Sequence, residues 1–215
     1  MSKYGYIGPD SSLPTQSIEN GNAGIFTVKD VLDLKQQGKY GPTNAGYRLL
    51  SVTNLSGSST IIGDITGYGQ YLVFVRGVTF SEDATLYLRF SNDNGATLES
   101  GGSDYDYFHR ELNDQGTIGN VTDNSDSEIE IGSGSEYTKP LDAHIELHHF
   151  DTDTTDAAIT FQFVKTETGG TIIDHGFGHG WYNTAEVING IGFVPSAGTF
   201  SGGQVVVYGV NIKWN

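Results

Sequence analysis

The amino-acid sequence predicts an all-β fold, an antiparallel two-sheet β-sandwich of the jelly-roll type, preceded by an extended N-terminal arm with one short helix. Two observations lead to this prediction. After residue 44, apolar and polar residues alternate with the period of two that a half-buried strand requires. Clusters of glycine, asparagine and aspartate separate these runs, as turns separate the strands of a sandwich. We therefore divide the chain into an N-terminal attachment arm, residues 1–44, and a β-sandwich domain, residues 45–215.

The arm contains one predicted helix. Thr27 is placed to cap its N-terminus, Asp30 follows three residues later as in a capping box, and Gly38 is placed to end it. A helix of about ten residues is marginal by itself in water, so it must dock on a partner surface. Two surfaces stay open, the end of its own sandwich and another subunit. The predicted attachment residues are the apolar Ile25, Phe26, Val28, Val31 and Leu32.

About ten strands are predicted after the arm, enough for the two packed sheets of a jelly roll. Residues 85–90 are a clear case, because leucine and phenylalanine alternate there with threonine, tyrosine and arginine. Residues 159–163 alternate in the same way. The full set of predicted strands is 47–53, 70–78, 85–90, 104–109, 127–131, 141–150, 159–163, 171–175, 186–194 and 205–214.

Composition excludes several classes of protein. The chain has 11 basic and 26 acidic residues, a net charge of −15, so it would repel a nucleic acid. Residues 61–215 hold 22 of the acidic groups, so the predicted sandwich carries this charge. No apolar run approaches the ~18 residues of a membrane span. The chain starts without the apolar segment of a secretory signal and has no cysteine, which excludes disulfides and thiol catalysis.

The sequence gives no support for nucleophilic catalysis. There is no G-x-S-x-G motif, and the serines fall in glycine- and aspartate-rich loops. His109, His144 and His175 would have to meet a serine and an aspartate by coincidence of the fold. Two carboxylates across a groove could cleave a glycoside, but nothing in the sequence pairs any two. We therefore predict that the protein is not an enzyme and needs no cofactor.

A zinc-like donor set lies within residues 144–149. His144, Glu146 and His148 fall on one face of a predicted strand, and imidazole and carboxylate are ligands that zinc accepts. The same pattern describes an amphipathic strand whose Ile145 and Leu147 are buried. Because no fourth ligand is evident, the structural interpretation is favoured, and no metal site is predicted.

Three further patterns each have a functional and a structural interpretation. His175 and His179 bracket Gly176 to Gly178 and are predicted to lie in a loop. The oxygen-rich segments 91–95 and 151–156 could hold calcium, but the first is more simply a hairpin turn and the second lacks the glycine and distal glutamate of a helix-loop-helix site. Sugar-stacking aromatics are conceivable at Tyr105, Tyr107, Trp181 and Tyr182, for which packing is the favoured interpretation.

Several stretches, taken in order, resemble small virion structural proteins of tailed bacteriophages of the tail-fibre or head-surface type. The stretches are residues 71–78 (YLVFVRGV), 83–91 (DATLYLRFS), 94–95 (NG), 103–107 (SDYDY) and 198–209 (GTFSGGQVVVYG). Their order is similar to that of the group's C-terminal domain, so the resemblance covers about residues 61–215. The arm segment 21–34 also looks like the start of such proteins.

The resemblance implies a non-enzymatic virion protein made in the cytoplasm of a bacterial host. Its arm would attach it to other virion proteins, and its sandwich would be displayed for contact with a host-surface glycan or receptor. A homo-oligomer is expected, with a trimer as one form. The alternative within the virion is a capsid decoration protein, and the alternative of another class is a carbohydrate-binding module.

Overall fold

A computed structural model describes residues 46–210 of the chain, and these residues form one compact unit of twelve β-strands with no helix. The strands are β1 (Tyr47–Asn54), β2 (Thr60–Ile62), β3 (Gln70–Phe80), β4 (Leu86–Ser91), β5 (Tyr105–Asn113), β6 (Ile118–Asp126), β7 (Ile129–Glu130), β8 (Leu141–His148), β9 (Ala158–Thr166), β10 (Ile173–Tyr182), β11 (Gly190–Pro195) and β12 (Phe200–Val210). In this part of the chain no helix has the length and apolarity needed to cross a membrane.

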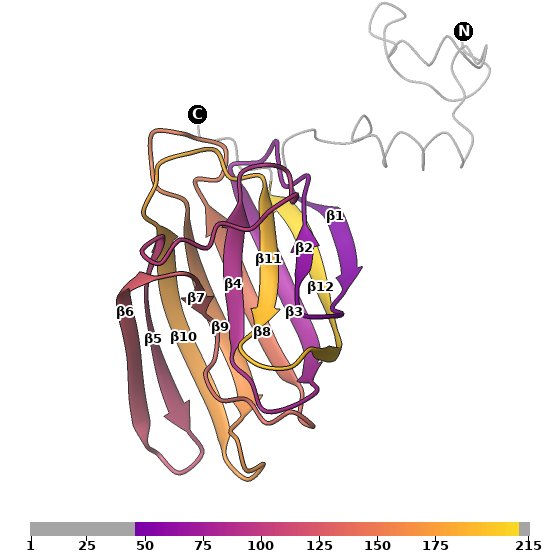
Figure 1. Cartoon of the computed structure of the whole chain (residues 1–215), viewed down its shortest axis with the longest axis vertical. Helices are drawn as coiled ribbons and strands as arrows, with labels where there is room; N and C mark the ends of the chain where they lie inside the picture. Colours follow the sequence, from indigo (N-terminus) through magenta and orange to yellow (C-terminus); the bar gives the residue numbers. More distant parts are fainter. Residues whose placement is uncertain (1–45, 211–215) are drawn as a thin grey trace, which may run out of the picture. The chain divides into compact units, whose positions relative to one another are not determined.

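The strands form two antiparallel sheets that pack face to face. The larger sheet has eight strands in the order β1-β12-β3-β8-β9-β10-β5-β6, and the smaller has four in the order β2-β11-β4-β7. Figure 1 shows the four-stranded sheet in front of the eight-stranded one. Every strand pair in both sheets is antiparallel. The predicted two-sheet antiparallel sandwich is therefore confirmed.

The core lies between the two sheets and follows the alternation seen in the sequence. Tyr71, Val73 and Val75 of β3 are buried, as are Leu86 and Leu88 of β4. Alternate residues of these two strands point away from the core, so each of the two contributes one apolar face. Burying a side chain of this size contributes about 1.5–3 kcal/mol, so the sum over the core is the main force that holds the sheets together.

Two strands were not predicted, for reasons that their sequences make clear. β2 has three residues, which is too short to show a period. β6 is an edge strand, and most of its residues are exposed, so it shows no apolar alternation. The predicted helix and the attachment residues Ile25, Phe26, Val28, Val31 and Leu32 lie outside the described residues, as does the end of the predicted strand 205–214.

The prediction that His175 and His179 lie in a loop is wrong, because both residues belong to β10. Gly176, Gly178 and Gly180 point into the core, where a side chain would have no room. A Cβ on Gly176 would overlap the ring of Phe163. A Cβ on Gly178 would overlap the Phe108 carbonyl and His109 Cβ of β5 and also the ring of Phe161. The glycines are therefore places where large neighbouring side chains fill the inner face of the strand.

Gly176→Ala tests this packing. The added methyl group would overlap the buried ring of Phe163, so we expect the free energy of unfolding to fall by about 1–3 kcal/mol. Gly119→Ala in β6 is the matched control, because nothing lies within 4 Å of its added methyl group. Denaturant unfolding of the two variants checks the prediction, and an equal loss of stability in both would contradict it.

Candidate functional site

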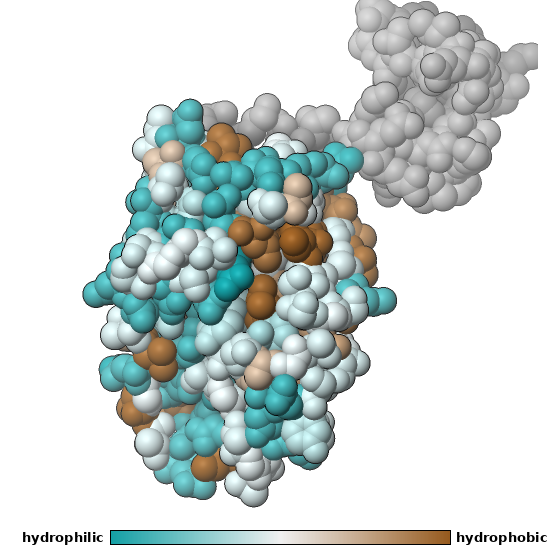
Figure 2. Space-filling model, viewed as in Figure 1, coloured by the Kyte–Doolittle hydropathy of each residue, from teal (hydrophilic) through white to brown (hydrophobic). Residues whose placement is uncertain are grey.

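Both outer sides of the sandwich expose apolar side chains. Figure 2 shows the side that carries the four-stranded sheet as mostly teal and white, with a brown patch in its upper right part. The outer face of the eight-stranded sheet carries exposed apolar side chains, which include Phe177, Val164 and Leu112. Within residues 46–210 no further layer covers it. An uncovered sheet face with large apolar side chains is a common feature of binding surfaces.

Strand register places aromatic and hydrogen-bonding side chains side by side on this face. Phe74, His144, Gln162 and Phe177 are successive cross-strand neighbours from β3 to β10. The adjacent row of outward side chains consists of Glu146 on β8, Thr160 on β9 and His179 on β10. Because backbone pairing fixes these rows, the side chains start from rigid positions.

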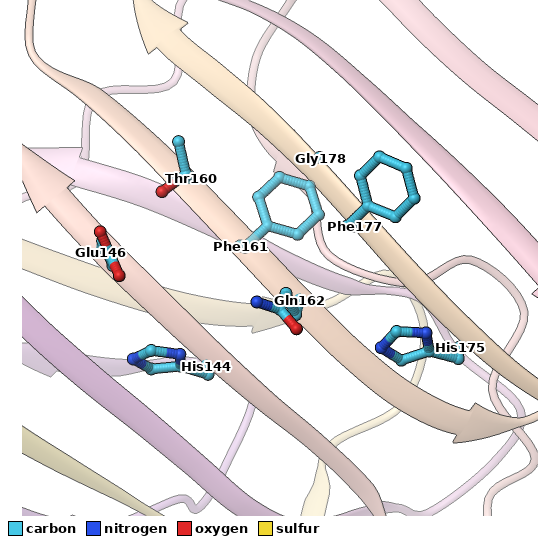
Figure 3. Close-up of a pocket in the computed structure, with 8 residues that line it drawn as sticks. All are labelled: His144, Glu146, Thr160, Phe161, Gln162, His175, Phe177 and Gly178. Carbon is cyan, nitrogen blue, oxygen red and sulfur yellow. The ribbon is translucent and has the colours of Figure 1, made fainter.

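Three adjacent strands form a shallow groove at the centre of the face (Figure 3). Its lining residues come from β8, β9 and β10, and the groove has a volume of about 400 Å³. The residues are His144, Glu146, Thr160, Phe161, Gln162, His175, Phe177 and Gly178. A second depression of about 150 Å³ shares His144, Gln162 and His175 with it and extends to Arg76 and Asp142.

The two carboxylates at the groove are already engaged by the protein. Asp142 accepts a hydrogen bond from the Gly77 backbone N–H at 2.7 Å, and Glu146 accepts one from Gln70 Nε2 at 3.1 Å. The Gln162 amide and the His175 ring have no side-chain partner within the described part of the chain. The Gln162 amide and the His175 ring can therefore donate hydrogen bonds to a ligand or accept them from it.

Aromatic rings stand beside these polar groups. Phe177 is 52% exposed, which is unusual for a phenylalanine in the middle of a strand. His144 stacks on Phe74 with ring centroids 4.8 Å apart, so its orientation is fixed. Trp181 is half-buried and stacks on His179 at 5.7 Å. The arrangement of open ring faces next to amide, hydroxyl and imidazole groups suits a polyhydroxylated ligand with apolar faces.

The other predicted aromatics are part of the core. Tyr105, Tyr107 and Tyr182 are buried, and Tyr105 donates a hydrogen bond to the Glu99 carbonyl. Burial raises the pKa of Tyr105 well above its usual range. The packing interpretation is confirmed for these three tyrosines.

The zinc-like donors lie on one face of β8, as the alternation predicted. His148 Nε2 lies 3.9 Å from Glu146 Oε2, but His144 is turned onto Phe74. Within residues 46–210 no three histidine or acidic side chains are grouped closely enough to hold a metal ion. His175 and His179 lie four residues apart on the outer face of β10 rather than around a common point.

Asp93 gives the segment 91–95 a structural role. Its carboxylate accepts hydrogen bonds from the Thr97 hydroxyl at 2.6 Å, the Thr97 backbone N–H at 2.9 Å and the Ser91 hydroxyl at 2.8 Å. These bonds, first those from Thr97, lower the pKa of Asp93 to about 2. The carboxylate closes a turn, as the structural interpretation expected. The turn is not the predicted hairpin, because β4 and β5 belong to different sheets.

The three histidines of the rejected catalytic triad do not meet. His109 is fully buried and faces the core, whereas His144 and His175 face outward. Its ring lies near Phe161 and Phe163, at centroid distances of 6.1 and 5.7 Å.

A second polar group of residues lies inside the sandwich, and of its members the sequence analysis had named only His109. Its members are His109, Glu111, Glu130, Lys165 and Asp174, and we call them the interior charge cluster. A signal was present in the alternation, because Lys165 continues the inward phase of Ile159, Phe161 and Phe163. A lysine at an inward position of a strand needs a buried partner.

Distances within the interior charge cluster are short. Lys165 Nζ lies 3.0 Å from Asp174 Oδ2 and 3.5 Å from Glu111 Oε2, and it donates a hydrogen bond to the Ser133 carbonyl. His109 Nε2 lies 3.2 Å from Glu111 Oε1 and 3.7 Å from Glu130 Oε1. The contacts of His109 with Glu111 and Glu130 are electrostatic and not hydrogen bonds, since neither ring nitrogen has a hydrogen-bond partner among the described residues.

Two carboxyls of the cluster have pKa values shifted in opposite directions. Burial acts to raise the pKa of Glu111, but the contact with His109 and the charge of Lys165 outweigh it, and the pKa is lowered. Burial raises the pKa of Glu130, and the nearby charge of Glu111 adds to this, so the attraction of His109 does not restore the usual value. The charged form is therefore stabilised at Glu111 and destabilised at Glu130.

Glu111→Gln and Glu130→Gln should change stability in opposite directions at pH 7. The charge of Glu111 contributes stability above its unfolded pKa of about 4.3, and this is lost as the pH falls through the lowered folded pKa. Glu111→Gln should then reduce the free energy of unfolding by about 1–3 kcal/mol at pH 7.

The contribution of Glu130 is present below about pH 4.3 and is lost as the pH rises through its raised pKa. Glu130→Gln should therefore increase the free energy of unfolding at pH 7 and have less effect at pH 4. Denaturant unfolding of both variants across this range checks the pair. Equal destabilisation by both at pH 7 would show that the two carboxyls do not differ in this way.

Comparisons of the chain with family models, with curated proteins and with solved structures find no match.

Proposed function

We propose that this protein is a non-enzymatic binding module that contacts a glycan through the outer face of its eight-stranded sheet. The observation that carries the proposal is the exposed ring of Phe177 beside Gln162 and His175, at the groove formed by β8, β9 and β10. A sugar ring offers apolar C–H faces to an aromatic side chain and hydroxyls to amide and imidazole groups. Rigid strands supply both kinds of contact with little loss of side-chain entropy.

The positions of the acidic residues argue against glycoside cleavage at the groove. Asp142 and Glu146 are the two carboxylates that line the depressions, and they lie four residues apart on one strand. That spacing is about 13 Å along a strand. Glycosidases need their two carboxyl groups ~5–5.5 or ~6.5–9.5 Å apart. Binding without bond cleavage is therefore the chemistry that this face supports.

The proposed site serves both biological settings expected from the sequence. A virion appendage of the tail-fibre type would use it for contact with a host-surface glycan, and a cellular carbohydrate-binding module would use it on its own target. We favour the virion appendage, with residues 1–44 as its attachment arm, because residues 61–215 resemble virion proteins. Labelling the chain in images of intact phage particles separates these settings, and hundreds of copies per particle would instead indicate a capsid decoration protein.

Phe177→Ala tests the binding surface. We expect the wild-type chain to bind at least one member of a panel of immobilised bacterial surface polysaccharides and neutral oligosaccharides. Loss of the Phe177 ring should weaken that binding by roughly tenfold or more, because burying such a side chain contributes about 1.5–3 kcal/mol. Surface plasmon resonance measures the dissociation constants.

Ile173→Ala is the matched control for Phe177→Ala. Ile173 lies on the same strand and is 53% exposed, but it does not line the groove. We expect its replacement to leave binding unchanged. Equal weakening by the two substitutions, or no binding by the wild-type chain to any glycan of the panel, would contradict the proposed function.

A further inference from the structure

Lys165 and Asp174 form a buried pair that the proposed glycan site does not use. They are directly paired across β9 and β10, and each side chain is only 2% exposed. Lys165 Nζ lies 3.0 Å from Asp174 Oδ2. The contact between Lys165 Nζ and Asp174 Oδ2 does not have hydrogen-bond geometry, since Asp174 Oδ2 has no hydrogen-bond partner among the described residues. The amine is thus held against the carboxyl group without being aligned as a donor to this oxygen.

A second carboxyl group lies within reach of the same amine. Glu111 Oε2 is 3.5 Å from Lys165 Nζ, on the neighbouring strand β5. The Ser133 carbonyl accepts a hydrogen bond from the amine and limits its movement. The ring of Phe163 lies two residues before Lys165 on the same inner face and is buried. The amine, the carboxyl group and a candidate proton carrier therefore meet at a site shielded from water.

We propose that Lys165 and Asp174 condense into an intramolecular amide bond, with Glu111 as the residue that carries the proton. The proposal concerns a covalent modification of the sandwich and is independent of the glycan site.

The reaction needs no oxidant, metal or external reagent. A proton passes from the Lys165 ammonium to the Asp174 carboxylate, which gives a neutral amine and a carboxylic acid. The amine nitrogen attacks Cγ of Asp174, and Glu111 accepts the proton that the nitrogen releases. Glu111 returns it to a hydroxyl of the tetrahedral intermediate, which leaves as water. One N–C bond forms, one C–O bond breaks, and the products are an amide and one water molecule.

The protein interior favours each step of this reaction. Two adjacent strands hold the reacting groups together, and such positioning can raise the effective concentration of a reactant to 10⁵ M or more, roughly. Removing two opposite charges from water is costly, and a neutral amide avoids that cost.

The amide would take the place of a disulfide in a chain that has no cysteine. It would join β9 to β10, the two strands that hold Thr160, Gln162, His175 and Phe177 at the groove. Strand separation would then require more than the breaking of backbone hydrogen bonds. A module exposed outside a cell would gain resistance to unfolding without depending on a redox environment.

The mass of the purified full-length protein under denaturing conditions tests the proposal directly. We expect it to be lower than the sequence mass by one water, about 18 Da. Tryptic digestion should show no cleavage after Lys165, and fragmentation should place the loss on a peptide that contains both Lys165 and Asp174. A mass equal to that of the sequence would overturn the proposal, as would a loss of water assigned to any other residues.

Two variants identify the chemistry. Lys165→Arg keeps the positive charge opposite Asp174, but a guanidinium is a poor nucleophile, so this variant should show the full sequence mass. Glu111→Gln should retain the pair but lose the proton carrier, and we expect at least a tenfold slower loss of water after refolding. A lighter Lys165→Arg protein would exclude the Lys165 amide. Unchanged kinetics in Glu111→Gln would exclude the role of Glu111. Neither result depends on glycan binding.

Discussion

The fit of Phe161 and Phe163 against the glycines of β10 is the contact on which the centre of the molecule depends. The rings occupy the space that side chains at Gly176 and Gly178 would need. The inner face of β10 is thus filled at these glycines by its neighbours β9 and β5. Asp174 and Tyr182 point inward on either side of them, whereas His175, Phe177 and Trp181 lie on the other face of the strand. One packing constraint therefore determines both how the core closes and why His175, Phe177 and Trp181 are on the open face.

The same region of the sandwich holds the interior charge cluster. A β-sandwich core normally excludes charged groups, and the cost is lowered here because Lys165 meets two carboxylates and a backbone carbonyl. The two glutamates of the cluster differ, since the environment stabilises the anionic form of Glu111 but not that of Glu130. Such a cluster is poorly explained as a contribution to stability alone, and a chemical role for Lys165 and Asp174 accounts for the burial of both.

In the proposals made above, the outer face of the eight-stranded sheet binds the glycan, and the interior charge cluster stabilises the strands. Strand register places the groove residues in rows, so binding requires no movement of the backbone. The cluster lies behind the same strands and would hold them together through a covalent bond. A stiff, cysteine-free sandwich with one open face suits a protein that meets a glycan on a surface, as virion appendages and carbohydrate-binding modules do.

The sequence by itself determined the fold class, because alternation with a period of two reports which face of each strand is buried. Residues 85–90 and 159–163 showed this plainly, and the tyrosines of 105–107 were correctly assigned to packing. It did not determine β2, which is too short to show a period, or β6, an exposed edge strand. It also missed β10 after residue 175, whose glycines resemble a loop until Phe161 and Phe163 are placed against them. Only the tertiary structure decided which strands are neighbours. For that reason the groove and the Lys165–Asp174 pair, which join residues of different strands, could not be read from the chain alone.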